Sequence, residues 1–153
     1  MNANLDKIDH SILTALQKDA TLSMDALAEK VHLSRNACWR RIRVMEEAGV
    51  IKARVALVDA EKVGLGLQVF VLIKAGAHDP KWLKQFHDAV RLMPQIVGAH
   101  RMSGDLDYVL RVRVGSVKDY DSFYQDLIRR VPISDVSASF VMDDIKDTTE
   151  LPL

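Results

Sequence analysis

Apolar residues in the first third of the chain recur with the three- to four-residue spacing of amphipathic helices. One such stripe covers residues 5–20 and predicts a first helix. A second pattern begins at Ser23 and a third at Ser34, and serine is a favourable N-cap at both places. Gly49 is positioned to end the third helix as its C-cap. Because only residues 32–33 separate the second pattern from Ser34, these two helices should cross at a steep angle, as in a helix-turn-helix.

The period changes after the third helix. Residues 50–58 alternate like a strand and predict a wing or linker strand, and Gly64 and Gly66 interrupt the pattern. Four further strands are expected at 68–75, 96–102, 107–114 and 136–142, and two helices at 80–93 and 117–131. The expected buried faces of these helices are Leu83, Phe86, Val90 and Met93 in the first, and Val117, Tyr120, Tyr124, Leu127 and Val131 in the second.

The order βαββαβ is that of a ferredoxin-like split unit, in which both helices cover one face of an antiparallel sheet. The other face then needs cover, which a second copy of the chain could supply. We therefore predict an α+β protein. An N-terminal winged helix-turn-helix domain covers residues 1–60, a linker covers 61–67, and a ferredoxin-like βαββαβ domain covers 68–153.

The distribution of charge is more informative than its total. Lys+Arg and Asp+Glu both number 21 in the 153 residues, so the whole-chain charge gives no sign of a nucleic-acid partner. Residues 35–54, however, carry six basic residues against two acidic ones. This local excess lies on the predicted third helix and the segment that follows it.

Several classes of protein are disfavoured by what the sequence lacks. No apolar run approaches the length of a membrane span, and residues 1–9 have neither the basic nor the apolar region of a signal peptide. Cys38 is the only cysteine, which excludes a disulfide within the chain and a metal site built on thiolates. A reducing compartment fits this usage, and we expect a cytoplasmic protein with no membrane partner.

The exposed face of the third helix carries the most specific chemistry. If Cys38, Ile42 and Met45 form its buried stripe, a turn of about 100 degrees per residue places polar side chains on the opposite face. Arginine reads guanine and asparagine reads adenine in the major groove, and arginine also grips phosphates. The candidate DNA-binding residues are Ser34, Arg35, Asn36, Trp39, Arg40, Arg41 and Arg43.

Two of these assignments have an alternative. The charge run alone would fit a solvated face on an ordinary helical bundle, but the tight turn and the second capped helix favour DNA binding. Trp39 either contacts phosphate or sugar or closes the core from the side, and we expect partial burial.

The run SMDALAEKVHLSRNACWRRIRVMEEAGVI, residues 23–51, resembles the helix-turn-helix of the leucine-responsive and asparagine-responsive regulators, the feast/famine (Lrp/AsnC) family. The resemblance continues through VALVDAEKVGLGL, RMSGDLDYVLRV and VSASFVMDDIKDTTELPL, and so covers essentially the whole chain. It implies a sequence-specific transcription regulator that binds double-stranded DNA and is modulated by a small amino acid held between subunits. It also implies a homodimer that assembles into a higher oligomer, commonly an octamer.

The resemblance implies a ligand site as well. The amino-acid effector would be leucine, methionine, another branched-chain amino acid or cysteine, with no other cofactor. By position, Asp107 would face its ammonium group and the backbone amides near Gly104 and Asp105 would take its carboxylate, which suits a zwitterion. The candidate ligand-binding residues are Gly104, Asp105, Leu106, Asp107, Tyr108, Ser137 and Ser139. Spacing alone would favour a simple hairpin turn at Gly104.

The sequence departs from the family pattern at two places. His32 stands where the turn before the recognition helix usually has glycine, and histidine can adopt the left-handed conformation at some cost. Arg35 and Asn36 occupy the region where a proline is usual, which leaves room for a different operator preference.

Two rival functions remain open at this stage. One is an amino-acid-binding regulatory subunit of a metabolic enzyme, but no catalytic group clusters and no phosphate-binding glycine loop is present. The five histidines, His10, His32, His78, His87 and His100, show no metal-ligand spacing, and Asp143 with Asp144 fits a solvated turn. We therefore expect no enzyme activity and no metal. The other rival is an architectural DNA-binding protein, which footprinting would distinguish.

Overall fold

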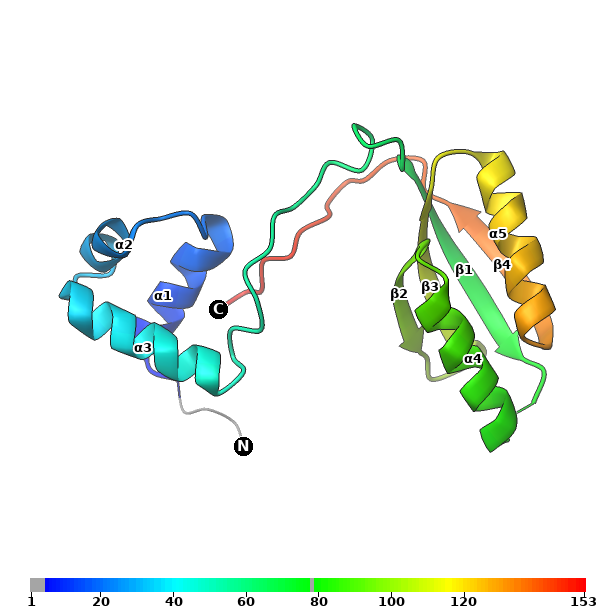
Figure 1. Ribbon diagram of the computed structural model, residues 1–153, viewed down its shortest axis with the longest axis horizontal. Coiled ribbons are helices and arrows are strands. Elements are labelled where there is room, and N and C mark those ends of the chain that lie inside the picture. Colours follow the sequence, from blue (N-terminus) through cyan, green and yellow to red (C-terminus); the bar gives the residue numbers. More distant parts are fainter. Residues whose placement is uncertain (1–4, 78) are drawn as a thin grey trace. The chain divides into compact units, whose positions relative to one another are not determined.

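The computed structural model of the chain describes residues 5–77 and 79–153. It divides into two compact units (Figure 1). One comprises the residues up to Leu57 together with Lys146–Leu153, and the other is Val58–Ile145. The sequence had placed all of 68–153 in the second domain, whereas the last eight residues pack with the first unit. A contact between segments so far apart in the chain leaves no periodic pattern from which it could be predicted.

The first unit contains the three predicted helices, α1 (Lys7–Lys18), α2 (Met24–Lys30) and α3 (Arg35–Glu47). The Ser23 hydroxyl accepts from the amide of Ala26, and that of Ser34 from the amide of Ala37, which confirms both N-caps. Gly49 adopts a left-handed φ of 71° just after α3, as expected of a C-cap glycine. His32 is also left-handed, with φ 56°.

The helices enclose a small core drawn mainly from the predicted stripes, although Ile8 and Ala20 of the first stripe are exposed and Ala15, outside it, is buried. Its buried members are Ile12, Leu13, Ala15, Leu27, Ala28, Cys38, Ile42 and Met45. Cys38 lies fully inside this cluster, and its burial raises the pKa of its thiol. It therefore packs as a small apolar side chain, with its thiol held in the uncharged form.

The second unit has the predicted βαββαβ order: β1 (Leu67–Ala75), α4 (Pro80–Leu92), β2 (Ile96–Arg101), β3 (Tyr108–Val114), α5 (Val117–Arg130) and β4 (Ile133–Phe140). The four strands form one antiparallel sheet in the order β2-β3-β1-β4. Both helices cover the same face (Figure 1), so the ferredoxin-like fold is confirmed.

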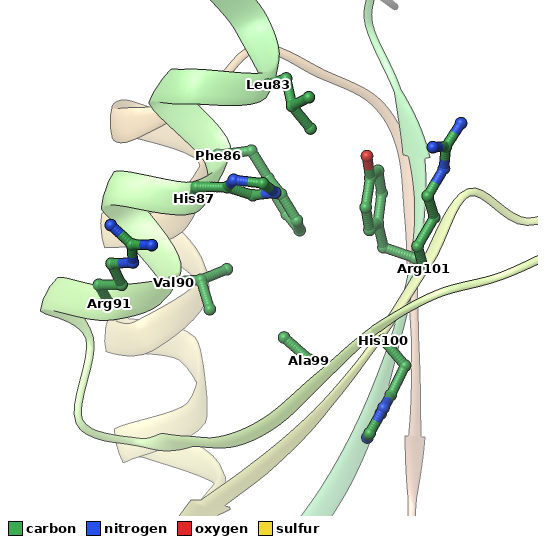
Figure 2. Close-up of a pocket in the computed structure, with 9 residues that line it drawn as sticks. Leu83, Phe86, His87, Val90, Arg91, Ala99, His100 and Arg101 are labelled. Carbon is green, nitrogen blue, oxygen red and sulfur yellow. The ribbon is translucent and has the colours of Figure 1, made fainter. Parts of the chain in front are cut away.

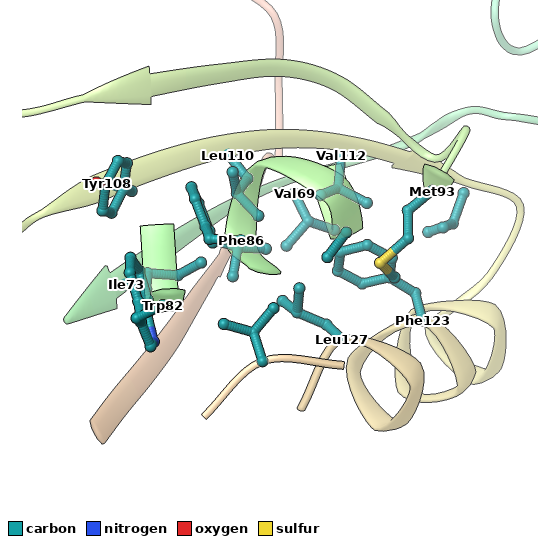
Figure 3. Close-up of a cluster of buried hydrophobic side chains, with 14 residues drawn as sticks. Val69, Ile73, Trp82, Phe86, Met93, Tyr108, Leu110, Val112, Phe123 and Leu127 are labelled. Carbon is teal, nitrogen blue, oxygen red and sulfur yellow. The ribbon is translucent and has the colours of Figure 1, made fainter. Parts of the chain in front are cut away.

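Alternate residues of the sheet fill the core beneath the two helices. Val69, Leu110 and Val112 face Phe86 of α4 and Phe123 of α5 (Figure 3). Along β3 the burial alternates residue by residue, as the sequence predicted. The opposite face carries the remaining residues of β1 and β3 and has no covering layer within the described part of the chain.

The rotation of both helices was predicted only in part. Phe86 and Leu127 are buried as expected, but Leu83 and Val117 are exposed, and the unpredicted Trp82 and Phe123 are buried instead. In α4 the ring of Trp82 stacks on Phe86 at 5.1 Å, and its indole N–H donates to the carbonyl of Pro132. The larger aromatic surface therefore takes the buried side of the helix in preference to the adjacent leucine.

The expected wing strand over 50–58 is wrong for the single chain. This segment forms no strand within the residues described, and Val55 and Leu57 are more than 70% exposed. Alternation reports which side of an extended segment is apolar, but a strand also needs a partner for its hydrogen bonds. Residues 5–77 and 79–153 provide no such partner.

Candidate functional site

On the polar face of α3, some side chains are held by hydrogen bonds or ion pairs and others have no such partner. The Ser34 hydroxyl is used by the N-cap, and Arg35 reaches Asp25 at 3.3 Å between two exposed side chains. Asn36 and Arg40 are exposed, and the described part of the chain offers neither of them a hydrogen bond or an ion pair. A ligand would therefore meet these two side chains without having to break an existing contact.

Trp39 does not close the core. Its side chain is 54% exposed and lies outside the buried cluster, so of the two alternatives the closure of the core from the side is not found. The guanidinium of Arg43 lies over its ring instead, 5.7 Å from the ring centroid. Cys38 and Ile42 already fill the core at this level of α3, which leaves the bulky indole outside.

Arg41 has a structural role that the sequence did not suggest. Its Nη1 donates to Asp6 Oδ2 and to Asp9 Oδ1, each at 2.8 Å. These hydrogen bonds raise the pKa of Arg41, that to Asp9 most. The pKa of Asp6 is lowered, first by the backbone amide of Asp9 and then by Arg41. Arg41 thus ties α3 to the capping box at the start of α1, although it was expected among the DNA-binding residues.

The turn between β2 and β3 carries the candidate ligand residues. Gly104 has φ 109°, a conformation that favours glycine, and Asp105 is exposed. Asp107 Oδ2 accepts from the amide of Ala75 at 2.8 Å, and the Asp107 amide donates to the carbonyl of Ile73 at 3.0 Å. Asp107 is therefore fixed against the end of β1, while Gly104 and Asp105 form the open tip of the turn.

The remaining candidates lie on opposite faces of the sheet. Tyr108 is buried on the helix side, with its ring 4.4 Å from that of Phe86. Ser137 and Ser139 are exposed and lie opposite Leu72 and Phe70 on the open face. A single chain therefore does not bring the two serines together with Tyr108.

A groove that the sequence did not reveal lies between α4 and β2 (Figure 2). It has a volume of about 390 Å³. Its lining residues are Leu83, Phe86, His87, Val90, Arg91, Ala99, His100, Arg101 and Tyr108. The only charged side chains in this set are basic. The pairing of Arg101 with Tyr108 across β2 and β3 places the groove next to the turn of residues 102–107.

Other candidate groups form no site. No cluster of three or more His, Cys, Asp or Glu able to hold a metal occurs among the described residues, and His78 lies outside them. Asp144, expected in a solvated turn, is 3.7 Å from Arg113 Nη2. Over the same residues, no helix is long and apolar enough to cross a membrane.

Comparison with known proteins identifies the class. Residues 5–52 match the family model described as winged helix-turn-helix DNA-binding, and residues 68–151 match the Lrp/AsnC ligand binding domain. The chain belongs to the Lrp/AsnC family, as the sequence resemblance had indicated. It is accordingly a DNA-binding transcription regulator with a ligand-binding domain, and not an enzyme.

Its relatives match over nearly their full length. The DNA-binding transcriptional activator DecR of Escherichia coli (strain K12) is 49% identical over 150 residues, which cover 97% of this chain and 99% of DecR. The crystal structure of an AsnC family transcriptional regulator from Agrobacterium tumefaciens has a TM-score of 0.93 and 50% identity, covering 97% of both chains. The transcriptional regulator NMB0573 of Neisseria meningitidis, in complex with L-Met, also has a TM-score of 0.93, at 33% identity over 97% of both chains.

Proposed function

We propose that α3 reads an operator through Asn36, Arg40 and Arg43, with the helices of two subunits bound at once. The observation that carries this proposal is the state of Asn36 and Arg40, which are exposed on the outer face of α3 and engaged by no neighbour among the described residues. Ser34, Arg35 and Trp39 border this face and would contact phosphate or sugar. Arg41 is not part of this reading face, because both of its ion pairs serve the packing of α3 on α1.

The direct test is Arg40→Ala, assayed on duplex DNA that the wild-type protein has selected from a random library. Loss of an arginine that reads a base should weaken binding by about 1–3 kcal/mol and relax the preference at one position. Arg130→Ala is a matched control, because Arg130 is an exposed helical arginine of the other unit. Equal affinity of Arg40→Ala and the control would contradict the proposal.

Footprinting addresses the architectural alternative. A regulator should protect one short operator within a longer fragment, whereas an architectural protein should cover the fragment with little preference. We expect a single protected operator, and we place the protein in the cytoplasm.

We further propose that the effector binds beside Gly104–Tyr108, with Asp107 facing its ammonium group and the open amides of the turn facing its carboxylate. Methionine is the first candidate, because the similar regulator NMB0573 is known as an L-Met complex. Leucine, another branched-chain amino acid and cysteine follow. Ser137 and Ser139 lie on the other face, so they would reach a ligand only through a neighbouring subunit.

The open sheet face supports assembly into a homodimer and then a higher oligomer such as an octamer. Phe70 is 37% exposed there, and Ser139 lies opposite it on the same face. Gln68 Oε1 and Arg111 Nε are buried and have no hydrogen-bond partner in the described part of the chain. Buried polar atoms are rarely left without a partner, and a second subunit on this face would provide one.

A thermal-shift screen of the twenty amino acids tests the effector proposal. A ligand at a hundredfold excess over its Kd stabilises the folded state by about 2.7 kcal/mol, which is a measurable rise in Tm. We expect a response to methionine or another candidate and none in Asp107→Asn, a variant that keeps an oxygen for the Ala75 amide but removes the charge. A wild-type response in Asp107→Asn would place the ligand elsewhere.

A further inference from the structure

The last residues of the chain contact α1 through a two-point hydrogen-bonded pair. Gln17 Nε2 donates to the carbonyl of Leu151 at 3.2 Å, and the Leu151 amide donates to Gln17 Oε1 at 2.7 Å. One side-chain amide therefore satisfies both backbone groups of a single residue, 134 positions away. This is the pairing that a neighbouring strand would make, supplied here by one glutamine.

The residues on either side of Leu151 favour the backbone conformation that this pairing needs. Pro152 follows it, and proline biases the preceding residue toward the extended conformation, in which the N–H and C=O point outward for pairing. Proline itself has no N–H, so the pairing cannot continue along the chain. On the other side, the Glu150 amide donates to Thr148 Oγ1 at 3.1 Å, which forms a turn just before the docked residue.

The residue beyond the proline forms part of the wall of a groove near Gln17. The groove has a volume of about 340 Å³ and lies between α1 and α2, with Leu153 as one of its lining residues. Ala15 and Val31 provide apolar surface in it, and Lys18 and Lys30 are its two lysines. The lysines complement the acidic Asp147 and Glu150 of the segment that docks there.

We propose that the DNA-binding unit carries a docking site for the chain's own C-terminal segment, Lys146–Leu153, and that the docked segment is a second tether on this unit. Gln17 and the groove between α1 and α2 form the site. The chain connects the two units twice, at Leu57–Val58 and again at Ile145–Lys146. Docking of Lys146–Leu153 attaches the second connection to the DNA-binding unit.

A second tether changes how the DNA-binding units of two subunits, here called reading heads, bind DNA together. A head attached at one point samples more orientations than a head attached at two, and the effective concentration of the second head at its half-site falls accordingly. Release of the segment should therefore weaken binding to DNA with two half-sites and leave binding to a single half-site unchanged. This consequence rests on the proposed function, whereas the docking itself does not.

Hydrogen exchange tests the docking without DNA or effector. In the full-length protein, exchange of the Leu151 amide should accelerate at least about fivefold in Gln17→Ala, because the loss of even one of the two hydrogen bonds, worth about 1 kcal/mol, has that effect. Gln85→Ala is the matched control, because Gln85 is an exposed helical glutamine on α4, and it should leave the exchange unchanged. Equal exchange in wild type and Gln17→Ala would overturn the docking site.

A mixture of two variants determines whether the segment docks on its own chain. In mixed oligomers of Gln17→Ala with a chain that ends at Ile145, only docking between chains could restore the protection of Leu151. We expect no restoration. Restored protection would overturn docking within one chain and assign the site to a neighbouring subunit's segment.

DNA binding then tests the tether. The probes are the duplex selected by the wild-type protein and the same duplex cut to one half-site. For Gln17→Ala and for the chain ending at Ile145, the Kd of the complete duplex should rise at least about fivefold relative to the half-site. If Leu151 loses its protection while this ratio keeps its wild-type value, the tether is refuted. If no variant or wild-type protein binds DNA, the proposed function fails and the exchange result still decides the docking site.

Discussion

The guanidinium of Arg43 is held between Trp39 and Glu47 on the outer face of α3. Its Cζ lies 5.7 Å from the centroid of the Trp39 ring, and its Nη2 lies 3.0 Å from Glu47 Oε1. Both contacts are exposed, so both are available to exchange for contacts with DNA. Arg43 therefore starts from a restrained position, whereas Arg40 beside it does not.

Glu47→Gln should strengthen DNA binding about fivefold at low salt, because it frees Arg43 and removes a negative charge next to the phosphates. The measurement is a titration of labelled operator at two salt concentrations, since the gain should shrink at higher salt. Asp126→Asn is the control, because it removes the acid of another exposed pair four residues apart, Arg130–Asp126 on α5. Unchanged or weaker binding by Glu47→Gln would show that Glu47 does not oppose DNA binding.

Arg41→Ala should lower the free energy of unfolding by about 1 kcal/mol, because it removes two charged hydrogen bonds that join α3 to α1. Urea denaturation followed by circular dichroism measures this loss. Arg40→Ala should leave stability unchanged, since Arg40 has no partner in the described chain. Equal stability of the two variants would contradict the structural role of Arg41.

The Asp6 carboxylate gives the contact between α3 and α1 a defined pH dependence. Its pKa is lowered from 3.8, so the unfolded state takes up a proton first as the pH falls. The stabilisation is complete above pH about 5 and is lost as the pH falls through the folded-state pKa. Asp6→Asn keeps an N-cap oxygen but cannot titrate. Acid titrations of the two proteins should therefore show a difference in stability that disappears at low pH, and a constant difference would contradict the assignment.

His32→Gly should stabilise the protein slightly, by up to about 1 kcal/mol. The left-handed conformation at φ 56° is strained for histidine and free of strain for glycine, although glycine loses more entropy on folding. Gly49→Ala should do the opposite, because it introduces a side chain at φ 71°. Thermal unfolding of both variants measures the two shifts, which should have opposite signs.

Trp82→Phe should lower the free energy of unfolding by about 1–2 kcal/mol. It removes buried ring surface between Phe86 and Tyr108 and the N–H that binds the Pro132 carbonyl. Trp39→Phe is the matched control, since Trp39 is 54% exposed and should cost little. Comparable losses in both variants, measured by denaturation, would show that the burial of Trp82 does not account for the effect.

Local patterns predicted the elements of this fold well. The capping serines, the C-cap glycine Gly49 and the alternation of β3 depend on residues close together in the chain. The rotation of α4 was less predictable, because Trp82 and Leu83 are adjacent and both apolar, and only the packed core decides between them. The missing strand at 50–58 shows the same limit, since its partner is not local.

The residues of the candidate site also divide into those that local patterns predict and those that depend on distant contacts. Asn36 and Arg40 could be placed on the outer face of α3 from helix periodicity alone. Arg41 could not, because its partners Asp6 and Asp9 lie on another helix more than thirty residues away. The separation of Tyr108 from Ser139 became apparent only from the strand register.

The DNA-binding unit is built from both ends of the chain, and this constrains how such a protein can be recombined. A gene fusion that joins residues up to Leu57 to a new sensor would omit Lys146–Leu153 and leave Gln17 without its partner. An exchange that inserts the new sensor in place of Val58–Ile145 would retain it. In this chain the unit Val58–Ile145 is therefore best regarded as an insertion within the DNA-binding unit. Exchanges that replace this unit at both of its ends should fold better than exchanges at Leu57 alone.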